Sequence, residues 1–356
     1  MKTVLRKVTA VVSAIILSVC GLLYASCKKE NGYYSAFCFD AEISVATFDG
    51  SLPDSVKRGI DEILYGLSGE FSLSGNGFLS RFNAAETGEE IAVSPLAFKV
   101  LEKMTAAHGI SPAFNPAVLP FLRLWHFTPD TKVPNGDFVP PTADEITAVK
   151  NSNSFDPTAF SFNEEKTAVV KNEKISFDAG GIIKGVAVDE ITELLKSKGY
   201  DSGYVNFGGS SISILSANSL SVTHPDDVSK NIIRVEKPEN VFVSTSGNYR
   251  TYYEYDGVRY SHIIDAESGR PTNSGVTSAI VFGNSGWLTD ATSTALMLLD
   301  KSGAENLIRT LVGNAEYGVL TVFVIINDGD EKTVLTNEKQ GEFTLLDDSY
   351  SVSTVV

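Results

Sequence analysis

Hydrophobic and polar positions change their spacing several times along the chain. Apolar residues recur at helical spacing or gather in short runs typical of β-strands. The expected helices cover residues 54–67, 94–107, 185–198, 289–299 and 304–311. The expected strands cover residues 30–50 (a strand or hairpin), 175–177, 204–207, 211–215, 232–236, 241–244, 252–255, 279–282, 320–326 and 333–336. Strands outnumber possible crossover helices, which predicts an α+β fold of mixed, mostly antiparallel sheets with packed helices.

Two polar stretches separate these elements. Residues 68–80 are rich in Gly and Ser, and residues 128–141 are rich in Pro, Asp and Gly, so both are predicted surface loops. Thr142 through Glu145 then fits a capping box, which predicts a short helix. We find no internal repeat.

The N-terminus has the layout of a secretory signal. Three basic residues (Lys2, Arg6 and Lys7) precede an apolar run over residues 8–23, and Ala25 and Ser26 follow it. A membrane-spanning helix needs roughly 20 apolar residues, more than this run supplies. A cleaved signal is therefore favoured over a retained signal anchor.

Cys27 refines this prediction. The segment Ala25–Lys29 resembles the bacterial lipobox, in which the cysteine is acylated and becomes the first residue; Tyr24 departs from that pattern, and an ordinary cysteine beside a cleavage site is the alternative. The predicted organisation is a signal peptide over 1–26, a tether over 27–35 and a domain of two intimately packed lobes over 36–356. The chain is then exported and anchored by lipid to a bacterial membrane, facing the periplasm or the cell exterior.

The net charge limits the partners. The formal charge is -15, and removal of residues 1–26 takes away three positive charges, which leaves -18. Such an acidic chain is repelled by phosphate backbones, so no nucleic-acid partner is expected. A phosphate-bearing ligand would need specific local groups or a cation.

A glycine-rich segment precedes one predicted helix. Asp178-Ala179-Gly180-Gly181 leads to Lys184 and Gly185, with Asp189 one turn further on. Glycines at such a junction let a ligand approach the backbone, and the helix N-terminus offers free amides to an anion. Lys184 is unfavourable for the helix dipole, which points to a phosphate as its partner. A tight structural turn is the alternative.

Three more segments contain residues that could bind a ligand or carry out chemistry. Asn206–Ser210 is a strand running into paired glycines, where a simple turn is the alternative. Ser244–Tyr249 precedes His262, but no G-x-S-x-G elbow exists in the chain, so a serine hydrolase is disfavoured. Asp290 and Thr294 are four residues apart, so on a helix they share a face and could hold a hard cation through oxygen atoms. A helix N-cap is the alternative for Asp290.

Taken together and in order, these segments resemble the FAD:protein FMN transferase family, known as ApbE-type proteins. The resemblance covers about residues 36–326. It is carried by Ser80–Asn83, Ala113–Pro116 with Leu124–Phe127, Asp178–Asp189, His262–Asp265 with Gly269–Pro271, and Asp290–Thr294. The departures from the family pattern are Pro112, Asn115, Ala266, Ser268 and the segment Phe39-Asp40-Ala41.

The resemblance implies an enzyme that binds FAD with Mg²⁺, transfers FMN to a Ser or Thr hydroxyl of an acceptor protein and releases AMP. It implies metal ligation by Gly181, Asp290, Ser293 and Thr294, and proton removal from the acceptor by His262. It implies FAD contacts from Phe39, Asn83, Ala113, Phe114, Asn115, Asp178, Lys184, Ser246, Gly247, Ile263 and Ile264, in a cleft. The expected acceptor is another exported protein of a redox complex.

Two other functions stay open at this point. With water as the nucleophile, the same site would be a Mg²⁺-dependent FAD pyrophosphatase that yields FMN and AMP. Without catalysis, the chain would be a flavin-binding lipoprotein, although capture alone does not require a metal-ligand pair.

Overall fold

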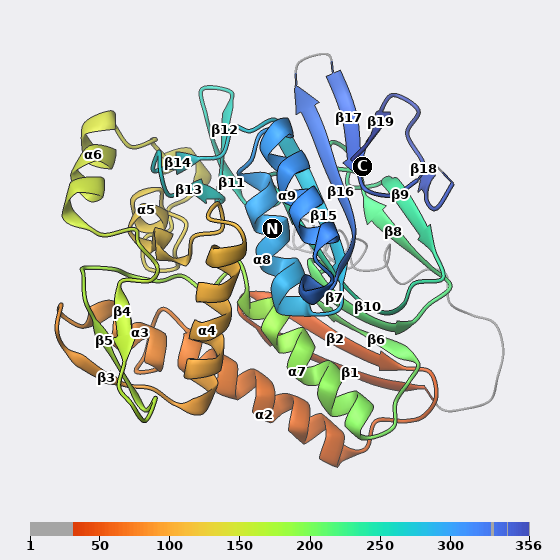
Figure 1. The fold of residues 1–356 in the computed structure, drawn as a ribbon, viewed down its shortest axis with the longest axis horizontal. Helices are drawn as coiled ribbons and strands as arrows, with labels where there is room; N and C mark the ends of the chain where they lie inside the picture. The colour runs from red at the N-terminus through yellow and green to blue at the C-terminus, as the bar shows by residue number, and fades with distance from the viewer. Residues whose placement is uncertain (1–30, 329–330, 340, 356) are drawn as a thin grey trace, which may run out of the picture.

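A nine-stranded sheet runs through the molecule (Figure 1). The computed structural model describes residues 31–328, 331–339 and 341–355, so the expected signal peptide and Cys27 lie outside the described residues. The strand order is β1 (Gly32–Cys38), β2 (Ala41–Thr47), β6 (Gly203–Phe207), β7 (Ser211–Ser216), β10 (Glu239–Gly247), β15 (Val276–Gly283), β16 (Val319–Asp328), β17 (Glu331–Thr336) and β19 (Ser351–Thr354). Neighbouring strands are antiparallel except β17 and β19, which are parallel.

Smaller sheets and the helices surround this sheet. The small sheets are β3 (Glu90–Ala92) with β5 (Ala168–Lys171) and β4 (Phe160–Phe162), β8 (Ser219–Thr223) with β9 (Asn231–Glu236) and β18 (Thr344–Leu345), β11 (Tyr252–Tyr255) with β12 (Val258–Ser261), and β13 (Ile264–Asp265) with β14 (Arg270–Pro271). The helices are α2 (Asp54–Phe71), α3 (Phe78–Ala84), α4 (Pro95–Ile110), α5 (Leu119–Leu124), α6 (Ala143–Ser152), α7 (Ile183–Ser197), α8 (Gly286–Met297) and α9 (Lys301–Gly313). Short 3₁₀ turns lie at Pro116–Val118, Asn135–Asp137 and Ala315–Tyr317. The predicted α+β fold is confirmed.

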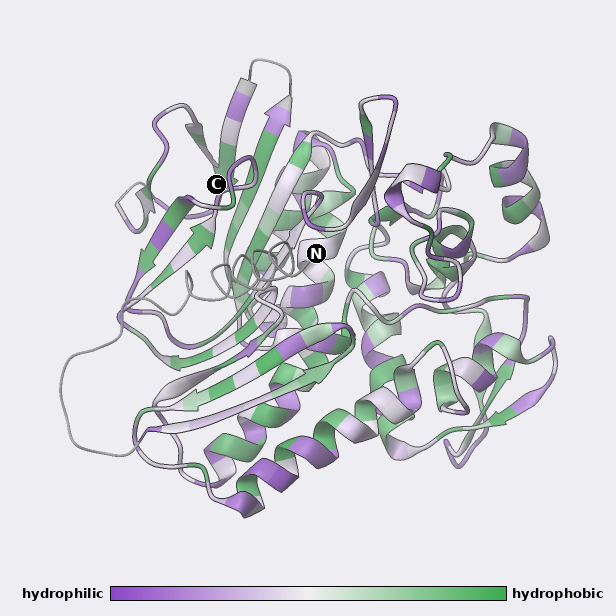
Figure 2. Cartoon of the chain, turned by 180° about the vertical axis from the view of Figure 1, so that it is seen from behind, coloured by the Kyte–Doolittle hydropathy of each residue, from purple (hydrophilic) through white to green (hydrophobic). Residues whose placement is uncertain are grey.

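The large sheet has a hydrophobic core on each face. Along β15, Ala279 and Val281 belong to the core shared with the helices, while Ile280 and Phe282 belong to the core beneath the β8–β9–β18 sheet. Successive side chains of a strand point to opposite faces. A strand covered on both faces is apolar at nearly every position, and the apolar residues are accordingly concentrated on the central strands (Figure 2).

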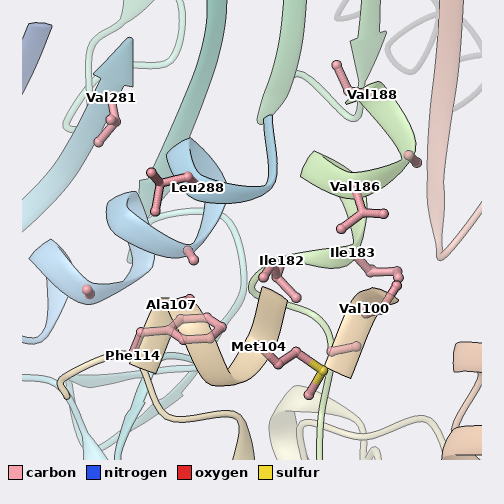
Figure 3. Packing of buried hydrophobic residues seen from close by; sticks show 14 of the residues in the cluster. Val100, Met104, Ala107, Phe114, Ile182, Ile183, Val186, Val188, Val281 and Leu288 are labelled. Carbon is pink, nitrogen blue, oxygen red and sulfur yellow. The ribbon is translucent and has the colours of Figure 1, made fainter. Parts of the chain in front are cut away.

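The helical face of the core joins α4 to the start of α7 and α8. Val100, Met104 and Ala107 of α4 are spaced by about one helical turn and point toward Ile183 and the loop residue Phe114 (Figure 3). All five side chains are at most 4% exposed. The core therefore fixes the N-terminal end of α7 in place.

Helices α7 and α8 approach closely because two glycines face each other. A Cβ at Gly185 would lie 2.2 Å from the carbonyl oxygen of Gly286, and a Cβ at Gly286 would lie 2.6 Å from that of Gly185. At this distance each helix supplies a carboxylate to the other. Asp290 of α8 accepts the Gly185 N–H at 2.9 Å, and Asp189 of α7 accepts the N–H groups of Gly286 and Trp287 at 2.5 and 3.0 Å.

We call this arrangement the cross-cap. The residues that precede the two helices, Ile182 and Ser285, make no side-chain cap of their own. Acidic groups at helix N-termini satisfy free amides and interact favourably with the helix dipole. The cross-cap thus replaces local caps and locks α7 against α8.

The expected strand at residues 175–177 is wrong. This segment joins no sheet. Instead, the side chain of Asn83 acts like a neighbouring strand: its Oδ1 accepts the Phe177 N–H at 2.7 Å, and its Nδ2 donates to the Phe177 carbonyl at 2.8 Å. The apolar alternation of Ile175 and Phe177 reflects burial, because both are at most 1% exposed.

Other boundaries also differ from expectation. The predicted loop over 68–80 is shorter, because α2 continues to Phe71 and α3 begins at Phe78. The predicted capping box is confirmed: Thr142 and Glu145 make both reciprocal hydrogen bonds before α6. In the described part of the chain, no helix combines the length and apolarity needed to cross a membrane.

The glycine contact gives a stability prediction. Gly185→Ala forces α7 away from α8, and we expect the free energy of unfolding to fall by about 3 kcal/mol, as in overpacked cores. The matched control is Gly109→Ala on α4, where a Cβ meets nothing within 4 Å. That change should raise the free energy of unfolding by about 0.5–1 kcal/mol. Denaturant unfolding of both variants is the measurement; equal effects would contradict the close contact.

Candidate active site

A cleft of about 860 Å³ opens where α7 begins and along one face of α8, beside the ends of β10 and β12. Most residues predicted for the site lie on its walls. They are Phe39, Phe114, Asn115, Asp178, Gly181, Lys184, Ser246, Gly247, His262, Ile263, Ile264, Asp290 and Thr294. They come from six separate parts of the chain, so the fold brings together what the sequence only spaced apart.

The glycine-rich segment forms one wall. Asp178 Oδ1 accepts the Gly180 N–H at 2.8 Å, which closes a tight turn before α7. Lys184 Nζ donates to the Gly180 carbonyl at 3.2 Å and makes no ion pair within the described residues. Gly181 faces Thr294: a Cβ here would lie 3.4 Å from the Thr294 hydroxyl oxygen.

Helix α8 supplies the opposite wall. Asp290 is 4% exposed, and burial raises the pKa of its carboxyl, an effect that the Lys184 charge partly offsets. The Thr294 hydroxyl donates to the Asp290 carbonyl at 3.2 Å. Ser246 Oγ lies 2.8 Å from Ser293 Oγ and 3.3 Å from Thr294 Oγ1, which ties β10 to this face of α8.

Lys184 lies at the electrostatic centre of the site. Its charge lowers the pKa of Asp178 and Asp290 against the upward effect of burial, and it adds to the burial that lowers the pKa of His262. One ammonium group is therefore close to all three side chains. Arg250 is the second cation that lines the cleft. The other charged residues on its walls are acidic: Asp40, Asp130, Asp178 and Asp290.

His262 is held in one tautomer. Its Nδ1 lies 3.1 Å from the Thr251 carbonyl oxygen. Since a carbonyl only accepts, Nδ1 carries the proton and Nε2 is left as a hydrogen-bond acceptor. Desolvation lowers the pKa of the imidazole to about 4, so the ring is neutral near pH 7 and can accept a proton.

The remaining walls are mostly apolar. Phe39 lies in the two-residue turn between β1 and β2, where it and Asp40 have φ of 46° and 56°. A bulky residue in this left-handed region is strained, and such strain often marks functional sites. The Asn115 side chain accepts the Ala117 N–H at 2.8 Å and donates to the Phe155 carbonyl at 2.9 Å, so it also shapes the loop that carries Phe114.

Three predicted site residues do not line the cleft: Asn83, Ala113 and Ser293. Both ends of the Asn83 amide are bonded to the backbone of Phe177, the residue just before Asp178. Ser293 is fully buried behind Ser246. These positions support the walls of the cleft from outside.

Arg250 and Tyr249 also line the cleft; Tyr249 ends the candidate segment Ser244–Tyr249, whereas Arg250 was not predicted. Arg250 Nη1 donates to the Gly208 carbonyl at 3.0 Å, so the guanidinium lies against the paired glycines Gly208 and Gly209. A signal was available, because Arg250 directly follows the candidate segment Ser244–Tyr249, and Gly208 and Gly209 belong to the candidate segment Asn206–Ser210.

The donor atoms suit a hard cation. In the described residues, no group of three His, Cys, Asp or Glu side chains is placed to hold a metal ion. One buried carboxylate, Asp290, faces the cleft without an ion-pair partner, and the Thr294 hydroxyl and the Gly181 backbone lie beside it. Mg²⁺ is commonly bound by one or two carboxylates together with substrate phosphates, so these residues fit Mg²⁺ if the ligand supplies phosphate oxygens.

Comparison with known proteins decides the family. Residues 39–317 match the sequence model of the ApbE family. The chain belongs to the ApbE family. Among curated relatives named FAD:protein FMN transferase, the Vibrio cholerae protein is 31% identical over 228 residues, which are 62% of this chain and 66% of the relative. The Haemophilus influenzae protein is 26% identical over 335 residues, which are 88% of this chain and 92% of the relative.

Solved structures agree with the ApbE assignment. The flavin transferase ApbE from Vibrio cholerae superposes with a TM-score of 0.73 at 25% identity, covering 86% of this chain and 97% of that one. The apo form of the Pseudomonas stutzeri flavinyl transferase ApbE has the same fold, with a TM-score of 0.72 at 23% identity, covering 87% and 96%. The predicted family and enzyme class, a flavin transferase, are confirmed.

The environment of His262 gives a titration prediction for this ApbE-family chain. We expect a pKa of about 4, and so no change in the His262 ring resonances between about pH 5.5 and 8 in NMR spectra assigned with His262→Gln. Because this folded-state pKa lies below the unfolded value, the contribution of His262 to stability is lost as pH falls from 6.5 toward 4. A midpoint near 6.5 would contradict the desolvation of the His262 ring.

Proposed function

We propose that this ApbE-family protein transfers FMN from FAD to a Ser or Thr hydroxyl of an acceptor protein in a Mg²⁺-dependent reaction that releases AMP. The observation that carries the proposal is the convergence of Asp290, Thr294 and Lys184 at one end of a cleft that also contains His262. The names of the relatives support flavin transfer. The assignments of the nucleophile and of the metal are supported by the residues of the site.

The reaction requires neutralisation of the charge on the diphosphate and alignment of the attacking and leaving oxygens. The acceptor oxygen attacks the phosphorus atom of the FMN half of FAD. The bond between this phosphorus and the bridging oxygen of the diphosphate breaks, and AMP leaves with the bridging oxygen. Phosphoryl transfer depends mainly on positioning and electrostatics. Lys184 contributes a positive charge to the phosphates, and His262 Nε2 accepts the acceptor's hydroxyl proton.

Mg²⁺, held by Asp290, Thr294 and the Gly181 carbonyl, would supply charge neutralisation at the diphosphate. Within the cleft, Phe39, Phe114, Ile263 and Ile264 provide apolar surface for the flavin ring, and Asp178 lies beside the helix N-terminus. Because the chain carries a formal charge of -15, local cations at this position offset the repulsion between protein and phosphates.

We further propose that the protein is exported and attached to a bacterial membrane through acylated Cys27. The basic, apolar and small residues before Cys27 support export, and the lipobox resemblance supports the anchor. The acceptor would then be another exported protein, a component of a redox complex. The acidic charge argues against a nucleic-acid partner.

One assay tests the reaction. The full-length chain is incubated with FAD, Mg²⁺ and a threonine-containing acceptor protein; we expect flavin fluorescence on the acceptor band together with AMP. Release of FMN and AMP without labelling would identify a pyrophosphatase instead, and bound but intact FAD would identify a flavin-binding protein.

The same assay includes Asp290→Asn and a matched control. Removal of the carboxylate should lower the transfer rate by roughly 10²–10³-fold, the scale of several kcal/mol of lost charge stabilisation. Asp201→Asn removes the same charge from an exposed position outside the cleft and should leave the rate unchanged. If Asp290→Asn and chelation of Mg²⁺ both leave transfer intact, the metal assignment is wrong.

A further inference from the structure

Strand β1 presents two aromatic side chains to solvent on the same face. Tyr33 is 57% exposed and Phe37 is 73% exposed. They are four residues apart, so they point to the same side of the strand and lie about 13 Å from each other. The side chain between them in sequence, Tyr34, points the other way, and its hydroxyl donates to Asp61 of α2 at 2.5 Å. The outward face of β1 is therefore separate from the helical core.

The small sheet on this side of the molecule does not reach β1. Paired residues of neighbouring strands share a face, and Tyr33 pairs with Ala46 of β2, which pairs with Tyr204 of β6. Tyr204 pairs with Ile214 of β7, which belongs to the core beneath the β8–β9–β18 sheet. Of the described residues, none from β1, β2 or β6 belongs to that core. The outward face of β1 is thus the uncovered end of a face that is buried further along the sheet.

The sequence of β1 gives it no protection as an edge strand. It is the first strand of the large sheet and pairs only with β2 among the described strands. Edge strands are commonly guarded by charged residues, Pro or bulges, but Gly32–Cys38 contains neither charge nor Pro. On the outward positions of β1 and β2 the one charged side chain is Glu42, opposite Phe37. An uncharged edge strand with exposed aromatic residues marks an interaction surface.

The position of β1 in the chain favours a lipid bilayer as its partner. Tyr33 follows Cys27 by six residues, which span at most about 22 Å. If Cys27 is acylated, β1 must lie close to the membrane. Lys28 and Lys29, directly after Cys27, add attraction to anionic headgroups. Tyr is enriched at membrane interfaces, where its ring has an apolar body and a polar tip.

We propose that the outward face of β1 lies on the surface of the bilayer, with Tyr33 and Phe37 at the level of the lipid headgroups. This inference rests on the proposed attachment through acylated Cys27. The free backbone groups along the edge of β1 would lose their hydrogen bonds to water in the hydrocarbon region, so the contact is confined to the interface. Because both aromatic residues touch the bilayer, the strand lies flat on it.

The flat orientation sets the height of the active site. The turn after β1 carries Phe39 and Asp40, which line the cleft. An upright β1 would raise this turn by about 20 Å above the membrane, whereas a flat strand keeps the cleft at the membrane surface.

Fluorescence quenching tests the contact. The chain has two Trp residues, and Trp125 is 1% exposed. Full-length, acylated Phe37→Trp is reconstituted into vesicles of phosphatidylcholine and phosphatidylglycerol, with or without phosphatidylcholine brominated near the headgroup. We expect brominated lipid to remove most of the emission that this variant adds to that of the wild type. The control Val312→Trp changes a 39% exposed residue on α9, which packs on the other face of the sheet, and should not be quenched.

Flotation of the vesicles separates this inference from the proposal on which it depends. Protein that floats with the vesicles but is quenched equally in both variants would overturn the docking of β1, while the anchor stands. Protein that stays behind would overturn the anchor and the docking together. The measurement needs no FAD, so a failure of FMN transfer does not affect it.

A second variant tests the orientation. Tyr33→Ser/Phe37→Ser keeps Cys27 and should float like the wild type. Its FMN transfer to a threonine-containing acceptor protein attached to the same vesicles should fall several-fold, because the cleft is no longer held at the surface. Transfer to the same acceptor free in solution should be unchanged. Equal losses for both acceptors, or no loss for either, would contradict the flat orientation.

Discussion

The cross-cap between α7 and α8 is the interaction on which the site depends. Asp189 and Asp290 are each taken out of water, and burial raises the pKa of both carboxyls, that of Asp189 to about 6. Amides at a helix N-terminus compensate for part of this cost. The geometry requires glycine at 185 and 286, because any larger residue would separate the helices and withdraw each carboxylate from its amides.

The close approach of α7 and α8 explains why the same residues stabilise the fold and line the proposed active site. Asp290 caps α7 and also faces the cleft, where Thr294 and the Gly181 backbone lie beside it. The alternative readings of Asp290 as a helix cap or as a metal ligand are therefore compatible, since the carboxylate is positioned for binding by the same hydrogen bond that caps the helix. Asp290 caps the neighbouring helix α7 and not α8, the helix to which it belongs.

The sequence predicted the α+β class, the main helices and most central strands, because both cores impose clear apolar periods on residues such as Ala279 to Phe282. It failed at residues 175–177, where Asn83 replaces a neighbouring strand through its side chain. Side-chain mimicry of a strand leaves no periodic signal. The motif residues of the cleft could be named from the sequence. Arg250 was not named, although it follows the candidate segment Ser244–Tyr249, because its contact with Gly208 joins segments that only the fold brings together.

The proposed function gives Asp290 two roles, one as the cap of α7 and one as a ligand of a cation. The direct measurement is a crystal structure of the chain with FAD and Mn²⁺ in place of Mg²⁺, with the metal located by its anomalous signal. We predict a peak within about 2.3 Å of an Asp290 carboxylate oxygen and the Thr294 hydroxyl, bridged to the phosphates of FAD, while Asp290 keeps its hydrogen bond to Gly185. A peak coordinated by other residues, or phosphates bound without a metal at Asp290, would contradict the role as a ligand.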